Sequence, residues 1–336
     1  MKQIKIGKKI IGDGYPTYII AEIGINHNGD VSLAKEMVLA AWESGADAVK
    51  IQTFVTKDFL HPKHPSYNYD INAEISHAKE QEIWDFAKNK NINLFSTPEE
   101  FKSLKFIKKQ KPKLIKIAAM DFNYKELVQK AALSGKPIIL SSGMSTMKEV
   151  KNTIRWVKEV GNDRYIVLHC VSCYPTKPSA CNLNAIKTMK QALDCPVGFS
   201  DHSIGIHIPL AAIVLGANVI EKHFTIEKKL PGPDQKCSMN PKELRELVQC
   251  ARDIESSLGN GRKEPSDEEK APRLYKRRGI YSSKNLKKGT ILKRKHVIFL
   301  APSNEKSSVS FWELFEGKQL IHDISRNMLI GKNDLK

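Results

Sequence analysis

Eight short runs rich in apolar and β-branched residues recur along the first 260 residues, and stretches with the periodicity of amphipathic helices separate them. The runs are Tyr18–Ile25, Ala48–Phe54, Ile92–Thr97, Leu114–Ala118, Pro137–Ser141, Tyr165–Val171, Pro196–Phe199 and Asn218–Phe224. Strands that are apolar on both faces and alternate with single helices are typical of a parallel sheet. Eight such units in about 250 residues are what a (β/α)8 TIM barrel requires, so we predict that α/β fold.

An open, doubly wound sheet is the structural alternative. Such a sheet more often has a Gly-x-Gly-x-x-Gly loop after its first strand. Here that turn reads Gly24-Ile25-Asn26-His27-Asn28-Gly29, which lacks the spacing. We therefore favour the barrel.

The pattern changes after residue 258. A polar stretch with glycine and proline covers residues 259–273 and is typical of a linker. From residue 274 the chain turns to short strands and turns. We predict a barrel domain at 1–258, a linker at 259–273 and a small, mostly β domain at 274–336.

The net charge is +17, and residues 261–336 hold 18 Lys and Arg against 9 Asp and Glu. Because aromatic residues do not interleave with the basic ones, we interpret this as a solvated lysine-rich surface and expect no nucleic-acid partner. The longest apolar run, Ile206–Ala217, is far shorter than the roughly 20 residues of a membrane helix. The basic N-terminus has no apolar signal segment after it. We expect a cytoplasmic protein with no membrane partner.

Polar side chains end all eight predicted strands, where the active sites of (β/α)8 barrels gather. They are Glu22, Lys50, Gln52, Ser96, Thr97, Lys116, Asp121, Ser141, Ser142, Ser172, Tyr174, Ser200, Asp201, His202, Glu221 and His223. Any one of them could simply be a hydrogen-bonded strand cap. Eight consecutive strands that end in this way indicate a shared site.

Two subsets suggest chemistry. Lys50 and Lys116, with nearby hydroxyl groups, suit a phosphate or carboxylate ligand. His202 and His223 end adjacent strands and could converge on one divalent metal; the alternative is that each is a hydrogen-bonded strand-end residue. Glu22 is the candidate general base, and Asp121 is a second carboxylate for proton transfer. The Cys170–Cys173 pair lacks the second pair of a structural zinc site, so buried thiols are the better interpretation.

Several motifs resemble the N-acetylneuraminate (sialic acid) synthase family, which includes the legionaminate and pseudaminate synthases and a spore-coat polysaccharide branch. The motifs are Ala21-Glu22-Ile23-Gly24-Ile25-Asn26-His27-Asn28-Gly29, Lys50-Ile51-Gln52-Thr53, Ser96-Thr97-Pro98, Ser142-Gly143-Met144, Tyr174-Pro175-Thr176, Gly198-Phe199-Ser200-Asp201-His202, Glu221-Lys222-His223-Phe224-Thr225 and Pro231-Gly232-Pro233-Asp234. The resemblance runs from about residue 17 to residue 258. Arg277-Arg278-Gly279-Ile280-Tyr281 through Gly289-Thr290 looks like the family's C-terminal antifreeze-like (SAF) domain.

The resemblance implies condensation of phosphoenolpyruvate with an N-acylated mannosamine-type aldose, which gives a nine-carbon 2-keto acid and phosphate. It also implies a homodimer in which each SAF domain caps the partner's barrel. Mn²⁺ is the expected cofactor, with Mg²⁺ or Co²⁺ as alternatives, held by His202 and His223. Glu22 would be the acid/base, and Gln52, Tyr174 and Asp234 would contact the sugar. Phosphoenolpyruvate would be held by Lys50, Thr97, Lys116, Ser141 and Ser200.

Three positions depart from the family pattern. A phosphate-contacting serine of the family is Ala119, followed by the shorter carboxylate Asp121. Ser172-Cys173 precedes Tyr174 where an Asn, or Ser-Glu, is usual. Leu300-Ala301-Pro302-Ser303 replaces the SAF-domain Arg-Pro-Gly, whose arginine reaches the sugar's N-acetyl group across the dimer. The segment Lys57–Lys79 is also short, with no assignable sugar-binding asparagine.

These departures leave the acceptor open. A 2,4-diacetamido-trideoxy-hexose, as used by legionaminate and pseudaminate synthases, is one alternative, and a phosphorylated sugar is another. A non-catalytic relative that binds through its basic tail is the alternative of a different class. Retention of Glu22, Lys50, Lys116, His202 and His223 together argues against that last interpretation.

Overall fold

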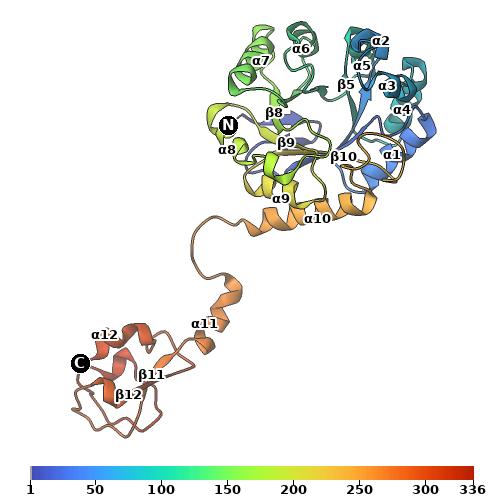
Figure 1. Ribbon diagram of the computed structural model, residues 1–336. Helices are drawn as coiled ribbons and strands as arrows, with labels where there is room; N and C mark the ends of the chain where they lie inside the picture. The colour runs from blue at the N-terminus through green and yellow to red at the C-terminus, as the bar shows by residue number, and fades with distance from the viewer. Residues whose placement is uncertain (1) are drawn as a thin grey trace. The chain divides into compact units, whose positions relative to one another are not determined.

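Eight parallel strands form the centre of the N-terminal part of the chain, in the spatial order β5-β4-β3-β10-β9-β8-β7-β6. The protein is described by a computed structural model that covers residues 2–336 (Figure 1). The strands are β3 (Tyr18–Gly24), β4 (Ala48–Thr53), β5 (Leu94–Pro98), β6 (Ile115–Ile117), β7 (Ile138–Ser141), β8 (Tyr165–Cys170), β9 (Val197–Asp201) and β10 (Val219–His223). The end strands β5 and β6 also lie next to each other, so the sheet is a nearly closed barrel. The predicted (β/α)8 fold is confirmed.

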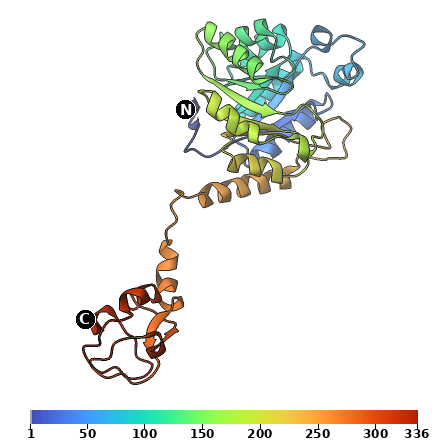
Figure 2. The ribbon, with the colours of Figure 1, turned by 60° about the vertical axis from the view of Figure 1, so that its left-hand side comes forward.

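A ring of helices surrounds the barrel, as Figures 1 and 2 show. One helix follows each strand: α1 (Val31–Glu43), α4 (His77–Asn89), α5 (Phe101–Gln110), α6 (Lys125–Ala132), α7 (Met147–Glu159), α8 (Asn184–Ala192), α9 (His207–Val214) and α10 (Pro241–Ser257). Local sequence explains their starts: the Asp30 side chain accepts hydrogen bonds from two backbone N–H groups of α1, and Asn240 with Glu243 forms a capping box on α10. Two short helices, α2 (Thr56–Phe59) and α3 (Tyr67–Ala73), interrupt the connection between β4 and α4.

Strand alternation divides the buried side chains into two layers. Outward residues such as Ile19, Val49 and Ile220 pack against the helices in the larger apolar core. A second core contains inward residues from the lower halves of the strands, among them Ile20, Phe95 and Leu168. Successive residues of a strand point to opposite faces, so each strand contributes to both cores.

An N-terminal hairpin, β1 (Ile4–Ile6) and β2 (Lys9–Ile11), closes the inner core. Ile4, Ile6 and Ile11 are buried in the same cluster as the inward residues of the lower barrel. Burial of each isoleucine side chain contributes about 1.5–3 kcal/mol of transfer free energy, which holds the hairpin against the barrel. The sequence analysis did not predict it, because three-residue strands carry little periodicity.

The C-terminal unit, Asn260–Lys336, is separate from the barrel unit, Met1–Gly259. Its regular elements are α11 (Lys270–Lys276), β11 (Gly279–Ser282), β12 (Val297–Leu300) and α12 (Trp312–Phe315), and β11 pairs antiparallel with β12. Isolated bridges link the remaining turns around a small core that includes Ile280, Leu292 and Leu320. Part of the segment predicted as a linker, 259–273, forms the beginning of α11. Within residues 2–336, no helix is both long and apolar enough to cross a membrane.

Candidate active site

Strand alternation places the candidate side chains inside the barrel, one layer above the inner apolar core. Ile20 belongs to that core, and Glu22 follows two residues later on the same face of β3; Ala48 and Lys50 stand in the same relation on β4. The cavity at this level is narrow, about 50 Å³. It is lined by Glu22, Lys50, Gln52, Thr97, Lys116, Ala118, Ala119, Ser141, Cys170, Tyr174, Ser200, His202, Glu221 and His223.

Four charged side chains, Glu22, Lys50, Lys116 and Glu221, form the charged floor of the cavity. Lys50 pairs with Glu22 Oε2 and lies 3.9 Å from Glu221 Oε2, while Lys116 Nζ donates to Glu221 Oε1 at 3.0 Å. All four side chains are at most 5% exposed. Buried charges are stable only when paired, and the two lysines and two carboxylates balance each other.

Burial and pairing shift the two carboxylates in opposite directions. Burial and the Glu221 charge raise the pKa of Glu22 to about 7, although Lys50 opposes them. Burial alone would also raise the pKa of Glu221, but Lys116 and Lys50 outweigh it and hold that pKa below its ordinary value. Glu22 can therefore gain or lose a proton near neutral pH, whereas Glu221 stays ionised. Two carboxyl groups with separated pKa values are a pattern of acid/base sites.

Hydroxyl groups surround the floor. Thr97 Oγ1 accepts a hydrogen bond from Lys50 at 3.0 Å, and Ser200 Oγ donates to Glu221 at 3.0 Å. Ser141 Oγ and Ser172 Oγ are buried, and neither has a hydrogen-bond partner within residues 2–336. Unsatisfied buried hydroxyls are uncommon in folded proteins, so a bound polar ligand is their expected partner.

Four residues above the floor, Tyr174, His202, His223 and Asp234, form the histidine rim. The two imidazole ring centres are 5.3 Å apart, and the Tyr174 ring lies 4.1 Å from that of His202. Asp234 Oδ2 is 3.7 Å from His223 Nδ1. Burial lowers the pKa of both histidines, and for His223 the His202 ring lowers it further, so both rings are neutral at neutral pH.

The rim could hold a divalent metal if oxygen atoms of a substrate and water completed the coordination. His202 Nδ1 bonds to the Val171 carbonyl at 2.9 Å, which leaves the other ring nitrogen for a ligand, a common arrangement for metal-binding histidines. His223 Nδ1 is buried and has no hydrogen-bond partner in the described chain. Among residues 2–336, no three His, Cys, Asp or Glu side chains form a complete ligand set. Two neutral imidazoles could bind one divalent cation, and Mn²⁺ would need oxygen ligands, which it prefers, in the remaining positions.

The structure brings together ten of the twelve predicted site residues around this one cavity: Glu22, Lys50, Gln52, Thr97, Lys116, Ser141, Tyr174, Ser200, His202 and His223. The other two lie next to it. Asp234 Oδ2 lies 3.7 Å from His223 Nδ1, and Asp121 lies buried in the turn after Ala119.

Two other strand-end residues do not take part in the shared site that the sequence predicted. Ser96 lies 2.6 Å from Thr53 Oγ1 on the helix side of the sheet, and Asp201 forms a 2.6 Å ion pair with Lys222 there. Both side chains face outward because each residue is the direct neighbour, along its strand, of a residue whose side chain points into the barrel. Glu221 was noted only as a strand end, yet it is the acid that holds both lysines. Its position two residues before His223 on the same strand face could have indicated this.

The segment between β4 and α4 reaches the rim. Tyr69 of α3 donates a hydrogen bond to Asn28 Oδ1 at 2.7 Å, and a Cβ atom on Gly232 would lie 2.7 Å from the Tyr69 hydroxyl. The charge of Asp70 on the same helix adds to burial in raising the pKa of Asp234 to about 6. The short segment Lys57–Lys79 therefore lies beside Asp234, although the family's asparagine cannot be assigned in it.

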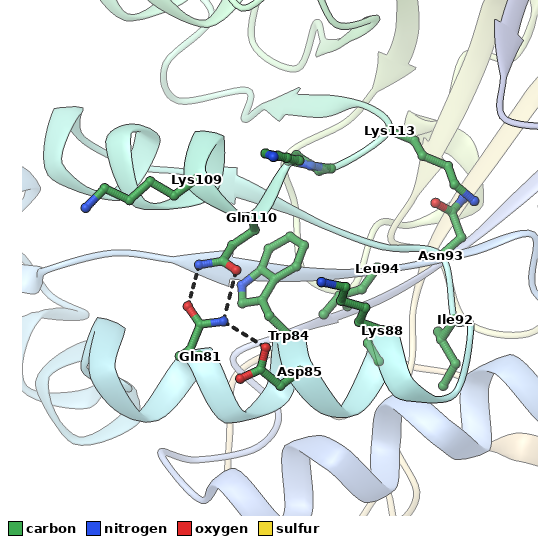
Figure 3. Close-up of a pocket in the computed structure, with 13 residues that line it drawn as sticks. Gln81, Trp84, Asp85, Lys88, Ile92, Asn93, Leu94, Lys109, Gln110 and Lys113 are labelled. Carbon is green, nitrogen blue, oxygen red and sulfur yellow. Dashed lines mark hydrogen bonds between the residues drawn. The ribbon is translucent and has the colours of Figure 1, made fainter.

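A larger groove lies outside the barrel, between α4 and the end of α5 (Figure 3). It measures about 460 Å³ and includes Trp84, Lys88, Lys109 and Lys113. Gln81 and Gln110 bond to each other across it, and Gln81 also bonds to Asp85. The groove contains none of the strand-end residues, so it is not the candidate active site.

Buried lysines, carboxylates and neutral histidines gather at the carboxyl end of the eight-stranded barrel, which is where (β/α)8 barrel enzymes have their active sites. The family model described as "NeuB family" matches residues 37–263. The chain belongs to the NeuB family.

Named relatives cover most of the chain. An N,N'-diacetyllegionaminic acid synthase of Legionella pneumophila is 39% identical over 314 residues, 88% of this chain and 88% of its own length. A pseudaminic acid synthase of Campylobacter jejuni is 33% identical and covers 95% of this chain and 96% of its own. The crystal structure of an N-acetylneuraminic acid synthetase from Leptospira borgpetersenii matches with a TM-score of 0.76 and 36% identity, over 81% of this chain and 95% of that one.

Proposed function

We propose that this protein condenses phosphoenolpyruvate with an N-acylated amino-sugar aldose, releasing phosphate and a nine-carbon 2-keto acid. The observation that supports the proposal is that two buried lysines and unsatisfied hydroxyl groups lie at the same barrel mouth as two neutral histidines. The first set suits a small polyanion, and the second suits a metal beside it. The names of the relatives supply the sugar class.

The charged floor would bind phosphoenolpyruvate by exchange of partners. Lys50 and Lys116 are occupied by Glu22 and Glu221 in the structure, so the phosphate and carboxylate groups must take over part of this pairing. Thr97, Ser141 and Ser200 would then donate hydrogen bonds to the anion. Because the floor is buried, these interactions would act in a site with little water, where they are stronger than at the surface.

The reaction balances with one water molecule. C3 of phosphoenolpyruvate bonds to the aldehyde carbon, the water oxygen bonds to C2, and the bond from C2 to the phosphate oxygen breaks. One proton of the water ends on the new hydroxyl group and the other on phosphate. Glu22, with a pKa of about 7, is suited to take the first proton from water. Asp121, whose pKa burial raises to about 6, would serve as the second carboxylate.

His202 and His223 would hold Mn²⁺, with Mg²⁺ or Co²⁺ as alternatives. When bound, the metal would act as a Lewis acid on the aldehyde oxygen. Gln52, Tyr174 and Asp234 would contact the sugar from the rim. A 2,4-diacetamido-trideoxy-hexose is the acceptor to test beside N-acetylmannosamine, since the relative with 39% identity is named for diacetyllegionaminic acid.

We also propose that the protein is a cytoplasmic homodimer and that residues 274–336 are an SAF domain. Leu274, Tyr275, Ile298 and Leu300 of the C-terminal unit are exposed large apolar residues, which supports burial against a second copy. Light scattering during gel filtration tests the dimer. A monomer at micromolar concentration would contradict it.

The direct test of function is a turnover assay. The protein is mixed with phosphoenolpyruvate, Mn²⁺ and, separately, N-acetylmannosamine, the diacetamido-trideoxy sugars and phosphorylated mannosamine, with and without a chelator. We expect chelator-sensitive phosphate release on one acceptor and a product whose mass equals that of phosphoenolpyruvate plus the acceptor plus water, minus phosphoric acid. Absence of turnover on every acceptor, together with no binding of phosphoenolpyruvate, would refute the proposal.

A further inference from the structure

The motif that contains Glu22 and the motif that contains Asp234 are joined in the structure by a residue that the proposed mechanism does not use. This residue is Asn26, which lies in the turn after β3 and is completely buried. Asp234 lies between β10 and α10, in residues 231–239, which we call the Asp234 loop. Hydrogen bonds of both the side chain and the main chain of Asn26 link the turn to this loop.

The side-chain link is a chain of donors with one direction. Asn26 Nδ2 donates to the Phe224 carbonyl and to Ser238 Oγ, both at 2.9 Å, so both hydrogens of the amide nitrogen are used. Ser238 Oγ donates its own hydrogen to the main-chain carbonyl of Asp234 at 2.7 Å. Because a carbonyl oxygen only accepts, the amide nitrogen must face Phe224, and the chain of donors that starts at Asn26 ends at Asp234.

The main-chain link holds the same loop through the residue directly after Asp234. Gln235 Nε2 donates to the Asn26 carbonyl at 3.2 Å and to the Pro231 carbonyl, at the start of the loop, at 3.3 Å. The side chains of Gln235 and Ser238 are both buried, so each link is made where little water can replace a lost partner. Asn26 therefore holds the Asp234 loop at two points.

We propose that Asn26 is a positioning residue that fixes the Asp234 loop against the end of β10 and thereby places Asp234 beside His223 in the histidine rim. One amide nitrogen bonds to Phe224, directly after His223, and to the serine that holds Asp234. The result is the 3.7 Å distance between Asp234 Oδ2 and His223 Nδ1. The consequence for sugar binding rests on the proposed function, whereas the anchoring of the loop does not.

The anchoring of the loop can be measured without turnover, by hydrogen exchange. The backbone N–H groups of Cys237 and Ser238 donate to the Asp234 carbonyl at 3.2 and 3.1 Å, so their exchange rates report how often the loop opens. We expect Asn26→Ala and Ser238→Ala to exchange about threefold to tenfold faster at these two amides, with the barrel strands unchanged.

Ser44→Ala is the matched control for the exchange experiment. Ser44 is buried like Ser238, and its hydroxyl also donates to a backbone carbonyl at 2.7 Å, but it lies at the end of α1. We expect this variant to exchange at the loop amides as the wild type does. Wild-type exchange of the loop in both Asn26→Ala and Ser238→Ala, or the same acceleration in Ser44→Ala, would overturn the proposal.

The positioning role is tested by the KM values of the two substrates. Ser238→Ala loosens the rim and leaves the charged floor intact, so we expect KM for the acceptor sugar to rise about threefold to tenfold and KM for phosphoenolpyruvate to stay within about twofold. Partial unfolding alone would lower kcat and leave both KM values unchanged. Asn26→Ala should separate the two KM values further, and the double variant should have a smaller effect than the product of the single effects, because both residues belong to one hydrogen-bonded chain.

The outcomes are distinct from those that test the proposed function. Ser238→Ala keeps Asn26 in place, so the test does not depend on the folding of Asn26→Ala. An unchanged KM for the acceptor in Ser238→Ala, or an equal rise in both KM values, would overturn the positioning role. A wild-type protein without turnover would instead refute the proposed function, and the exchange rates would then support or overturn the anchoring of the loop by Asn26.

Discussion

The charged floor and the histidine rim occupy one cavity but are built in opposite ways. In the floor, each charged group is paired with another: Lys50 with Glu22, and Lys116 with Glu221. In the rim, His223 Nδ1 has no hydrogen-bond partner within residues 2–336, and Asp234 approaches it only to 3.7 Å. The charges of the floor balance each other without a ligand, whereas a buried ring nitrogen of the rim has no partner of its own. Substitutions in the floor should therefore affect both folding and activity, and those in the rim activity alone.

The largest effect is expected from Lys116→Met. It leaves Glu221 buried without its nearest cation, which costs about 3–5 kcal/mol of unfolding free energy. It also removes the proposed contact with phosphoenolpyruvate, which we expect to lower kcat by roughly 10²–10³. Urea unfolding and phosphate release measure the two effects. Lys222→Met is the control, because Lys222 is equally buried in its pair with Asp201 but lies on the helix side of the sheet. A similar loss of activity in both variants would show that the floor position of Lys116 is unimportant.

His202→Ala and His223→Ala should separate the rim from the floor. We expect each to lower metal-dependent phosphate release by about two to three orders of magnitude while the unfolding midpoint changes little, since neither ring satisfies a buried charge. The measurement is a Mn²⁺ titration of turnover with a parallel urea melt. His207→Ala, an exposed histidine five residues beyond His202, is the control. A rim variant that is fully active at ordinary Mn²⁺ would contradict the metal assignment.

The pH dependence of turnover and of stability tests the role of Glu22 in the charged floor. With the Glu22 pKa raised from 4.5 to about 7, the base is increasingly protonated below pH 7, so kcat/KM for phosphoenolpyruvate should fall about tenfold per pH unit there. Stability should change in the opposite direction. The native state binds more protons than the unfolded state between pH 4.5 and 7, so this group's contribution to stability is present below 4.5 and is lost as pH rises through about 7.

Glu80→Gln is the control for both trends. Glu80 has a pKa of about 7 from burial, but it lies outside the barrel, so this variant should alter the stability curve and leave the rate limb in place. If Glu80→Gln moved the acid limb of the pH–rate profile, a carboxyl group other than Glu22 would be responsible for that limb.

The smallest effect is expected where floor and rim meet. A Cβ atom on Gly24 would lie 3.1 Å from Glu22 Oε1 and 3.5 Å from His223 Cε1, and its φ of 56° is left-handed. Gly24→Ala should cost about 1–2 kcal/mol of stability and lower turnover several-fold. Gly135→Ala is the control, because its φ is 67° and nothing lies within 4 Å of the added atom. Equal turnover in the two variants would indicate that the space beside Gly24 has no catalytic importance.

The apolar pattern of the sequence was sufficient to predict the barrel. All eight predicted strands appear, with bounds within about two residues, because long runs such as Tyr18–Gly24 are buried on both faces and carry a strong signal. Most of the site followed from the same pattern, since strand ends at one edge of a barrel must converge. The β1–β2 hairpin was missed because Ile4–Ile6 and Lys9–Ile11 are too short to show a period and become buried only through long-range contacts.

The details of charge pairing could not be predicted from the sequence. Glu99 occurs in Pro98-Glu99-Glu100, where either acid could cap the next helix; in the structure Glu100 does so, and Glu99 is buried at the end of β5. This choice depends on the neighbouring strand and not on local spacing. The roles of Glu22, Asp121 and the sugar-contacting residues stay predictions, to be decided by the experiments above.

The β1–β2 hairpin leaves the barrel accessible from one end only. Ile4, Ile6 and Ile11 seal the end opposite the mouth with an apolar cluster, so water and ions have no passage below the charged floor. Everything that reaches the floor must pass the rim, and an acceptor sugar bound at the rim would cover whatever lies beneath it. Under the proposed function, phosphoenolpyruvate would therefore bind first and could not leave while the sugar remained bound.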